Sequence, residues 1–426
     1  MMEVLYVYAD FDWLQRQSAD AESASPMLVG ELGYESLRGS DSYSFRFDTE
    51  WLRHYGNIML SADINNYPGQ QYTQQGKDIF CCFADALPDR WGRTILNRRE
   101  QIQAQEEHRP VRRLSSFDYL VGIDDASRMG GFRFCQEKGG AFINSDASLR
   151  IPPMTDIRSL VAASREIEHC EEENTLPAKK WIQQLVHPGT SLGGARPKAA
   201  VMDERKVMYV AKFPSRKDDY DVALWEHLCL LLAAKAGIDA AESSVVAVGE
   251  KHHALLSRRF DRDRNGRRIH FASAMTMLGL TDGSDAQSGN GYLDIVDFMV
   301  QNCCNVKENL HELYRRVAFN IAVRNTDDHF RNHGFLLTPQ GWTLSPAYDI
   351  NPTLNDYQSI LINSTTNKSD LQTLADSHED YLISQNDAER IIEEVVGAVK
   401  QWKPMALKLG ISKREMDIFE MKWDLL

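Results

Sequence analysis

The stretch that constrains this chain most is residues 320–352, where three polar side chains flank a short apolar motif at fixed spacing. Asp327 is followed five positions later by Asn332, and Asp349 comes seventeen positions after Asn332. Two short apolar runs lie between Asn332 and Asp349, and a Pro-Gln-Gly link at residues 339–341 joins them. Short runs joined in this way predict a β-hairpin. Because a hairpin brings its two ends together, we expect Asn332 and Asp349 to lie side by side.

The oxygens of these side chains suit a magnesium site. Mg²⁺ binds few protein ligands and completes its shell with phosphate and water, so Asn332 and Asp349 can serve as its protein ligands. A third carboxylate, Asp327, can then orient an attacking hydroxyl group. Protein-kinase catalytic loops have this order of Asp-x-x-x-x-Asn, hairpin and metal-binding Asp. Here Tyr-Asp-Ile at residues 348–350 replaces Asp-Phe-Gly, so the chain is not an ordinary eukaryotic-type kinase.

The same residue types also have a simpler explanation. Asp, Asn and Thr side chains such as those of residues 325–328 cap helices and form turns, and single residues of these kinds usually do no more. Prolines at positions 346 and 352 frame Asp349, and the complete ordered set favours the catalytic interpretation.

Length and charge limit the classes of protein to consider. A chain of 426 residues with 43% hydrophobic and 26% charged residues can bury a large core in two or three subdomains. The net charge of -13 excludes a nucleic-acid footprint over the whole surface, so any DNA contact needs a local basic patch or a partner. We expect no membrane span and no secretion signal, because no apolar run approaches about 18 residues and residues 1–10 lack the required pattern.

The cysteines indicate a reducing compartment. The chain has seven, an odd number that includes two adjacent pairs and no Cys-x-x-Cys motif. This pattern is typical of neither a disulfide framework nor a zinc site. We therefore expect a cytoplasmic protein whose thiols act mostly as small apolar residues.

The N-terminal part is predicted to combine β-strands with helices. Three short runs rich in β-forming residues are found at residues 4–8, 27–34 and 42–47. Helical spacing of apolar residues follows over 77–99, where Pro88 predicts a kink or a new first turn. A second helix is expected over 155–172, capped by Thr155 or Asp156. A soft boundary at 136–153 ends an N-terminal domain of residues 1–140.

A Gly-rich segment at residues 187–198 is the next candidate site. Small residues allow backbone N–H groups to approach phosphate oxygens, and Gly permits the positive φ angles of an anion-binding loop. A predicted hairpin follows, with Lys212 on its second strand. A strand lysine facing the phosphates is what a small β lobe over ATP requires. Glu226, on a helix predicted over 220–236, could pair with Lys212 as a helix Glu does in kinases.

The rest of the chain is predicted to be mainly helical. Strands at 245–248 and 253–260 lead into a segment that could link two lobes, and residues 150–262 make up the ATP-binding region. Helices are expected at residues 294–304, 306–323, 387–402 and 413–421. Residues 355–378 are polar, and we expect a mobile loop near the site. The fold class is therefore α+β, with two lobes and a helical C-terminal lobe over 263–426.

Several motifs, taken in order, resemble one family, the HipA-type toxin kinases of bacterial type II toxin–antitoxin systems. The matching segments are residues 28–32, 80–93, 121–126, 191–198, 212–215, 259–262, 326–332 and 344–349. Together they cover most of the chain, and their order is highly specific although no single motif is decisive. One departure is Ser257-Arg258, where many members have an apolar residue and an acid. Backbone groups normally hold adenine there, so nucleotide binding is expected to remain.

The resemblance implies a two-lobed kinase-like fold and a serine/threonine kinase that uses Mg-ATP. Asp327 would be the catalytic base, Asn332 and Asp349 the metal ligands, and Lys212 the residue that holds the α- and β-phosphates. Ser191 would be autophosphorylated, with Thr190 as an alternative acceptor. The residues implied to contact ATP are Gly193, Gly194, Ala195, Arg196, Pro197, Lys198, Lys212, Arg258, Arg259, Phe260, His329, Phe330, Arg331, Asn332, Tyr348 and Asp349.

The resemblance also implies partners. The best-known targets of the family are aminoacyl-tRNA synthetases, and its partner is a small helix-turn-helix antitoxin that binds operator DNA. DNA contact would therefore be indirect. Two other functions stay open: a non-catalytic corepressor that holds an antitoxin on DNA, and an enzyme that phosphorylates a small molecule. Retention of Lys212, Asp327, Asn332 and Asp349 argues against a scaffold without activity.

Overall fold

The structure, a computed structural model, divides into two compact units. Unit 1 contains Met1–Lys217 and Arg259–Ala272, and unit 2 contains Asp218–Arg258 and Ser273–Leu426. Each unit is thus built from two separate stretches of chain, and each is described by itself. The described residues are 2–16, 25–37, 40–74, 76–145, 151–186, 194–249 and 251–423.

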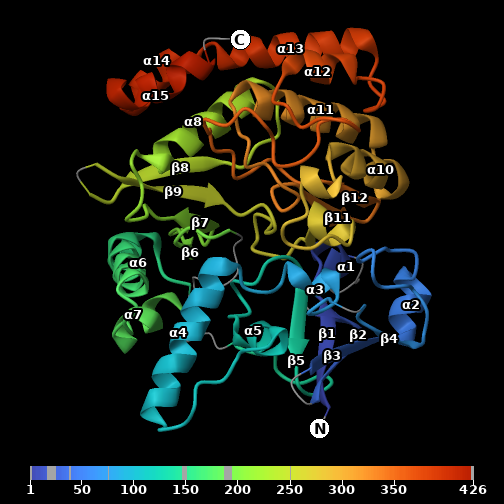
Figure 1. The fold of residues 1–426 in the computed structure, drawn as a ribbon. Helices are drawn as coiled ribbons and strands as arrows, with labels where there is room; N and C mark the ends of the chain where they lie inside the picture. Colours follow the sequence, from blue (N-terminus) through green and yellow to red (C-terminus); the bar gives the residue numbers. More distant parts are fainter. Residues whose placement is uncertain are drawn as a thin grey trace. The chain divides into compact units, whose positions relative to one another are not determined.

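An antiparallel sheet of five strands forms the centre of unit 1 (Figure 1), in the order β4-β3-β2-β1-β5. Alternate residues of β1 are buried, as expected for a strand with one face against a core. Phe83 packs against Phe45 and Phe134 from two of these strands, which covers one face of the sheet. The strands are β1 (Glu3–Ala9), β2 (Met27–Leu37), β3 (Ser40–Phe47), β4 (Gln70–Tyr72) and β5 (Phe132–Cys135).

The helices of unit 1 reflect local sequence signals. Pro88 does interrupt the predicted helix, which the structure splits into α3 and α4, and the Asp89 side chain caps α4 by accepting a 2.7 Å hydrogen bond from the Gly92 N–H. Asp156 is the N-cap residue of the 155–172 helix, as one of the two predicted alternatives had it, but its side chain makes no cap hydrogen bond and a 3₁₀ turn (η1, Met154–Asp156) precedes the helix. The helices are α1 (Asp12–Arg16), α2 (Thr49–Tyr55), α3 (Cys81–Ala84), α4 (Arg90–Glu106), α5 (Ser116–Gly122), α6 (Ile157–Glu172) and α7 (Lys179–Leu185).

Unit 1 also contains the hairpin that follows the Gly-rich segment. Its strands, β6 (Lys198–Met202) and β7 (Met208–Lys212), are antiparallel, and Lys198 lies opposite Lys212. The predicted strand pair is therefore confirmed. The Gly-rich segment thus runs directly into a paired strand, which gives its C-terminal end a firm anchor.

Unit 2 combines a second hairpin with a layer of helices. The strands β8 (Ser243–Ala247) and β9 (His253–Arg258) pair, and α8 (Val222–Lys235) contacts both. Helix α8 is apolar on nearly every side because C-terminal helices also pack against it. The other helices are α9 (Ala274–Met277), η2 (Ala286–Ser288), α10 (Tyr292–Asn302), α11 (Val306–Ala322), α12 (Leu371–Asp376), α13 (Gln385–Val399), α14 (Trp402–Leu409) and α15 (Lys413–Trp423).

The prediction for residues 355–378 is wrong in part. The segment contains α12, and the side chains of Gln358, Ile360 and Ile362 are at most 1% exposed. Both the N–H and the hydroxyl of Ser359 donate to the Thr326 carbonyl, so the expected position near the candidate site is confirmed. The burial was missed because a few apolar residues among polar ones give a weak local pattern.

The α+β class is confirmed, with strands and helices in both units. The boundaries of the compact units differ from those of the predicted domains. The predicted boundary at 136–153 lies within unit 1, and the stretch Arg259–Ala272 also belongs to unit 1. Strand β10 (Phe271–Ser273) runs across the change from unit 1 to unit 2. Over the described ranges, no helix combines the length and the apolar character that crossing a membrane requires.

Candidate active site

The candidate catalytic loop lies in unit 2, between α11 and the strand that follows it. Arg324, just beyond the end of α11, has a φ of 57°, which turns the chain out of the helix. The Asn325 N–H then donates to the Asn320 carbonyl at 2.8 Å, and the Trp423 indole donates to the Val323 carbonyl at 3.0 Å. The loop therefore starts from a point that two buried contacts hold in place.

The predicted hairpin after Asn332 is confirmed. Strands β11 (Gly334–Thr338) and β12 (Gly341–Leu344) are antiparallel, and their base is closed by a 2.8 Å bond from the Ser345 N–H to the Gly334 carbonyl. The Tyr348 hydroxyl donates to the Arg331 carbonyl at 2.5 Å. These bonds place the segments on either side of the hairpin next to each other, as the sequence predicts.

Asp327 reaches solvent at this loop, yet its surroundings are unfavourable for a negative charge. Partial burial raises the pKa of its carboxyl, the charge of His329 lowers it, and Asp349 and Asp328 raise it further, so that the result lies above the usual value. The effect of Asp349 also means that the two carboxylates lie within electrostatic reach of each other. A raised pKa is what a carboxylate that accepts a proton near neutral pH requires.

Asn332 and Asp349 are each held by a neighbour. The Asn332 amide nitrogen donates to the Asp327 carbonyl at 3.2 Å, so the amide oxygen is the atom with which it would bind a cation. One oxygen of Asp349 accepts a 3.1 Å bond from Asn351. An amide oxygen and a carboxylate are ligand types that Mg²⁺ accepts. Phosphate and water would complete the shell of such an ion. In the described part of the chain, no group of three His, Cys, Asp or Glu is arranged for a metal.

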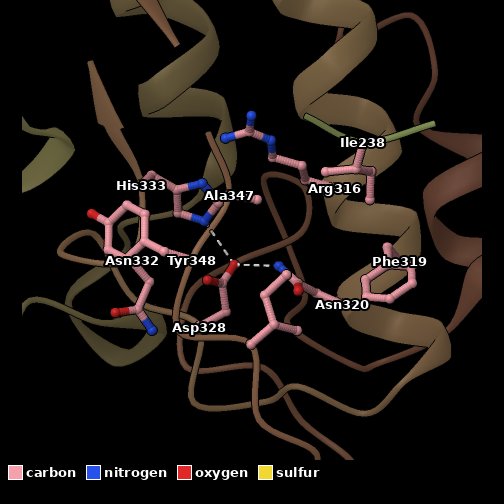
Figure 2. A pocket seen from close by; sticks show the side chains of 10 residues that line it. Ile238, Arg316, Phe319, Asn320, Asp328, Asn332, His333, Ala347 and Tyr348 are labelled. Atoms are coloured by element: carbon pink, nitrogen blue, oxygen red, sulfur yellow. Dashed lines mark hydrogen bonds and ion pairs between the residues drawn. The ribbon is translucent and has the colours of Figure 1, made fainter. Parts of the chain in front are cut away.

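A buried network beneath the loop was not predicted. Figure 2 shows Asp328 bonded to Asn320 and His333, at 2.8 and 2.7 Å, and Tyr292 adds a third bond at 2.5 Å. Burial would raise the pKa of Asp328, but the charge and hydrogen bond of His333, with Tyr292, hold it below its usual value. The sequence signal was the pair of adjacent acids at 327 and 328, of which the kinase pattern uses one.

A cavity of about 190 Å³ lies beside the loop. Most of the residues that line it have polar side chains, and two of them, Arg331 and Asp282, form an ion pair whose atoms are 2.7 Å apart. The residues that line it are Met275, Thr281, Asp282, Gly283, Ser284, Asp285, His329, Phe330, Arg331 and Ser359. Predicted site residues 329–331 thus form one wall of an open cavity.

The Gly-rich segment is described from Gly194 onward, and Thr190, Ser191 and Gly193 lie outside the described residues. Gly194 has a φ of 89°, which supports the expected use of glycine. Ala195 is exposed, and Arg196 and Lys212 are partly buried. Their contacts with a nucleotide stay a prediction, as does the Lys212–Glu226 pair, since those two residues belong to different units.

Lys198 has a different environment from the one expected of a phosphate ligand. Its side chain is 3% exposed, and its ammonium lies 3.2 Å from Asp89, whose side chain is 4% exposed. The Trp91 indole donates to the Lys198 carbonyl at 3.1 Å. Pro197 is buried beside it. The contacts give Lys198 a structural role between α4 and β6, and its contact with a phosphate stays a prediction.

The predicted interlobe residues also have protein partners. Arg258 pairs with Glu242 at 2.9 Å within unit 2. Arg259, in unit 1, is buried, pairs with Asp261 at 2.6 Å and donates to the carbonyl of Ser127 at 2.6 Å. Its guanidinium therefore holds this part of the chain, and its contact with ATP stays a prediction. The Phe260 ring packs at a tilt against Phe271, with ring centres 5.8 Å apart, and its contact with adenine stays a prediction.

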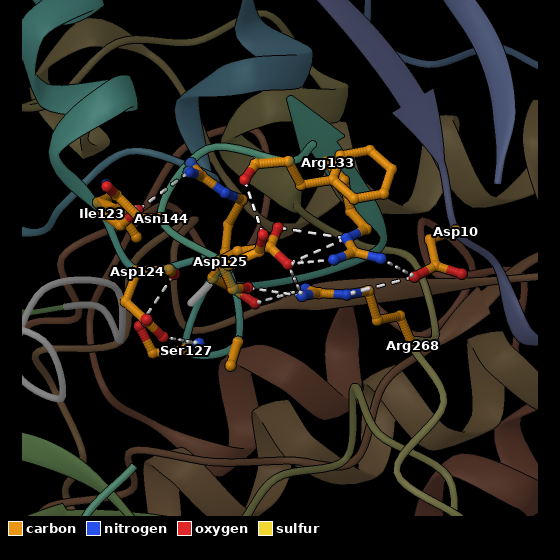
Figure 3. A network of polar contacts seen from close by, with 12 residues as sticks. Asp10, Ile123, Asp124, Asp125, Ser127, Arg133, Asn144 and Arg268 are labelled. Carbon is orange, nitrogen blue, oxygen red and sulfur yellow. Dashed lines mark hydrogen bonds and ion pairs between the residues drawn. The ribbon is translucent and has the colours of Figure 1, made fainter. Parts of the chain in front are cut away.

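The Arg259–Asp261 pair adjoins a wider network of buried charges in unit 1, and Figure 3 shows the part of that network around Asp125. Asp125 bonds both Arg133 and Arg268, and Asp10 lies 3.2 Å from Arg133. Besides its contacts with arginines, Asp261 accepts a 2.8 Å hydrogen bond from the Gly130 N–H. The network joins residues more than 100 positions apart and fixes the stretch Arg259–Ala272 within unit 1.

Comparisons with known proteins agree with this geometry. The HipA-like C-terminal domain family matches residues 190–403, and the HipA N-terminal domain family matches residues 24–117. The serine/threonine-protein kinase toxin HipA of Shewanella oneidensis is 20% identical over 352 residues, which are 76% of this chain and 72% of that protein. A candidate kinase of Haemophilus influenzae is 28% identical over 179 residues, 38% of this chain. The match spans about half of that relative, 52% of its length.

A solved structure gives the same fold. HipA of Shewanella oneidensis MR-1, in a complex with HipB and its operator DNA, matches with a TM-score of 0.63 at 15% identity. The match covers 97% of this chain and 93% of the other. Both family domains, in their order along the sequence, and the fold agree. This chain belongs to the HipA family of kinases.

Proposed function

We propose that this chain is a Mg-ATP-dependent serine/threonine protein kinase and the toxin of a type II toxin–antitoxin module. The observation that carries the proposal is that Asp327 and Asn332 share one loop of unit 2, to which hydrogen bonds from Tyr348 and Asn351 tie the segment that contains Asp349. Asn332 bonds the Asp327 backbone, and Asp349 acts electrostatically on the Asp327 carboxyl. A base, an amide oxygen and a carboxylate in one place are the parts that phosphoryl transfer needs.

Each residue has a role in the proposed reaction. Bound Mg-ATP supplies the phosphoryl group, with its charge neutralised in part by the cation. Asn332 and Asp349 would hold the cation, and Lys212 the α- and β-phosphates. Asp327 would orient the acceptor hydroxyl and take its proton, which its raised pKa favours. The cavity lined by residues 329–331 would give the acceptor segment a place near this base.

The partners follow from the family and are part of the same proposal. We infer a protein substrate of the translation apparatus, such as an aminoacyl-tRNA synthetase, and a small helix-turn-helix antitoxin that carries the contact with operator DNA. The Shewanella oneidensis relative, in complex with HipB and operator DNA, supports an antitoxin partner. A cytoplasmic location is consistent with the cysteines, all seven of which lie in described ranges and none of which forms a disulfide.

Autophosphorylation of Ser191 would regulate the enzyme. A phosphate there adds roughly -1.5 to -2 charges beside the nucleotide site, which would oppose the binding of ATP. Thr190 is the neighbouring alternative. Mass spectrometry of protein incubated with Mg-ATP would distinguish the two acceptors.

The decisive experiment is incubation with labelled ATP and Mg²⁺. Wild-type protein should label itself and a protein substrate, and Asp327→Ala should lower transfer by about 10²–10⁴-fold while ATP still binds. Ser191→Ala should remove only the autophosphorylation. Asp297→Asn, an exposed change on α10, is the matched control and should label normally.

One result would favour the corepressor instead. If wild-type protein carries no label and phosphorylates nothing, yet binds its antitoxin tightly, the chain acts as a binding module. Phosphoproteomics after expression of wild type and of Asp327→Ala would then identify the substrate, or show that there is none.

A further inference from the structure

The buried carboxylate of Asp328 accepts three hydrogen bonds beneath the catalytic loop. Its side chain is 3% exposed, and one oxygen, Oδ2, accepts all three bonds, from Tyr292, Asn320 and His333 (Figure 2 shows the latter two). The donors come from α10, from α11 and from the residue before β11. A single oxygen therefore joins two helices to the end of the loop.

Asp328 and His333, which bond each other, are sequence neighbours of the proposed functional residues. Asp328 directly follows Asp327, and His333 directly follows Asn332. The 2.7 Å contact between Asp328 and His333 thus closes the loop immediately next to both proposed functional residues. Inside the loop the Asn332 N–H donates to the His329 carbonyl at 2.8 Å. The distance between the base and the amide ligand is set by this closure.

The histidine depends on Asp328 for its orientation. The other ring nitrogen of His333, Nδ1, is buried and has no hydrogen-bond partner within the described residues. The backbone of His333 is fixed separately, because its carbonyl accepts a 2.8 Å bond from the Ala274 N–H. Loss of the carboxylate would free the ring and leave three buried donors unsatisfied.

We propose that Asp328 is a positioning residue for phosphoryl transfer, which holds Asp327 and Asn332 at their working separation through Tyr292, Asn320 and His333. The inference rests on the roles proposed above for Asp327 and Asn332. Asp328 itself touches neither nucleotide nor acceptor in this assignment. A displacement of about 1 Å in a reacting group can lower a rate about 10²-fold, so a buried anchor of this kind affects the rate directly.

The test compares Asp328→Ala and Asp328→Asn with wild type, using Mg-ATP and the protein's own autophosphorylation or its identified substrate. We expect kcat per folded molecule to fall about 10²-fold in Asp328→Ala and about tenfold in Asp328→Asn, while KM for ATP changes little. Circular dichroism and thermal melting give the folded fraction. Asp297→Asn, exposed on the same helix as Tyr292, serves as the control and should keep the wild-type kcat.

A double-mutant cycle separates positioning from general stability. Tyr292→Phe removes one of the three donors and should lower kcat several-fold alone, but should add nothing in the Asp328→Ala background, because no acceptor for the Tyr292 hydroxyl is left there. If Asp328→Ala fails to fold, Asp328→Asn and Tyr292→Phe carry the test. A kcat per folded molecule within twofold of wild type in Asp328→Asn, or additive effects in the cycle, would overturn the proposal.

The outcome for Asp327 keeps the two proposals distinguishable. An Asp327→Ala variant without activity beside a fully active Asp328→Asn variant rejects the positioning role alone. An active Asp327→Ala variant rejects the proposed base, whatever Asp328 does.

Discussion

Asp349 lies at a point of backbone strain. Its φ of 57° is in the left-handed region, which costs a residue with a Cβ roughly 1–2 kcal/mol, although Asp tolerates it better than most. Its neighbours Tyr348 and Asn351 are both tied to the catalytic loop, which holds the strained conformation. Strain of this kind is found at functional sites, where the surrounding structure imposes it. The geometry therefore supports a functional use of the Asp349 side chain.

Two substitutions separate strain from metal binding at Asp349. Both Asp349→Ala and Asp349→Gly should weaken the binding of Mg-ATP, because both remove the carboxylate. Asp349→Gly should be more stable than Asp349→Ala by about 1 kcal/mol, because glycine adopts this φ without strain. Calorimetry with Mg-ATP and thermal melting measure the two effects, and unchanged affinity in both variants would count against the metal role.

Lys198 and Asp89 offer a second prediction for single residues. Lys198→Met leaves Asp89 buried without its partner, which should lower the free energy of unfolding by about 3–5 kcal/mol. The double variant Lys198→Met/Asp89→Asn should recover most of this loss, because Asn can still cap α4. If the double variant also binds ATP like wild type, Lys198 has no phosphate contact. Recovered stability with lost ATP affinity would restore the nucleotide role predicted from the sequence.

At the scale of elements, the sequence predicted what depends on neighbours in the chain. The β11–β12 hairpin follows from two short apolar runs and a Pro-Gln-Gly link, and it forms with a two-residue turn. The break in the helix at Pro88 and the strands around Lys212 are equally local. Each of these features needs no knowledge of distant residues, so pattern and turn chemistry were enough.

The features that the sequence did not predict depend on distant partners. Nothing local distinguishes Arg259, which is buried among carbonyls 132 and 131 positions away, from an exposed arginine. Asp328 likewise looks like a second turn-forming acid until Tyr292, 36 positions away, is seen to bond it. Buried polar groups require partners, but the sequence does not say which ones. The sequence therefore offers candidate reacting residues, whose roles stay a prediction, but it does not identify the buried residues that support them.

The buried network of unit 1 leads to a prediction on pH. Burial alone would raise the pKa of Asp261, but Arg259 and Arg262 outweigh it and hold the pKa well below the usual range. Burial would also raise the pKa of Asp125, but Arg268 and Arg133 outweigh this effect, so that the pKa lies below the usual value. A depressed carboxyl pKa stabilises the fold above the unfolded value of about 4, and the stabilisation is lost as the pH falls below it.

Thermal melting between pH 7 and pH 3 should therefore show a steep loss of stability at the acid end. Asp261→Asn should lower the free energy of unfolding at pH 7 by about 3–5 kcal/mol, and with it the melting temperature, because it leaves two buried arginines without their carboxylate. Its stability should also vary less with pH than that of wild type. Equal acid sensitivity in the two proteins would show that Asp261 is not a source of the effect.

At the scale of the whole molecule, the net negative charge limits how the chain can bind DNA. The net charge is -13 and the isoelectric point about 5.4, so at neutral pH the chain as a whole repels a polyanion. The Shewanella oneidensis relative was solved together with HipB and operator DNA. Binding through phosphates alone needs clustered Lys and Arg.

We therefore expect the isolated chain to leave operator DNA unshifted in a gel assay at 0.15 M salt, and to join the complex once its antitoxin is present. The antitoxin should set the salt dependence of the complex, because it would make the phosphate contacts and release the counterions. Lowering the salt to 50 mM tests the alternative of a local basic patch, whose attraction would then strengthen. A shift by the chain alone that weakens steeply between 50 and 200 mM salt would place DNA contacts on this protein itself.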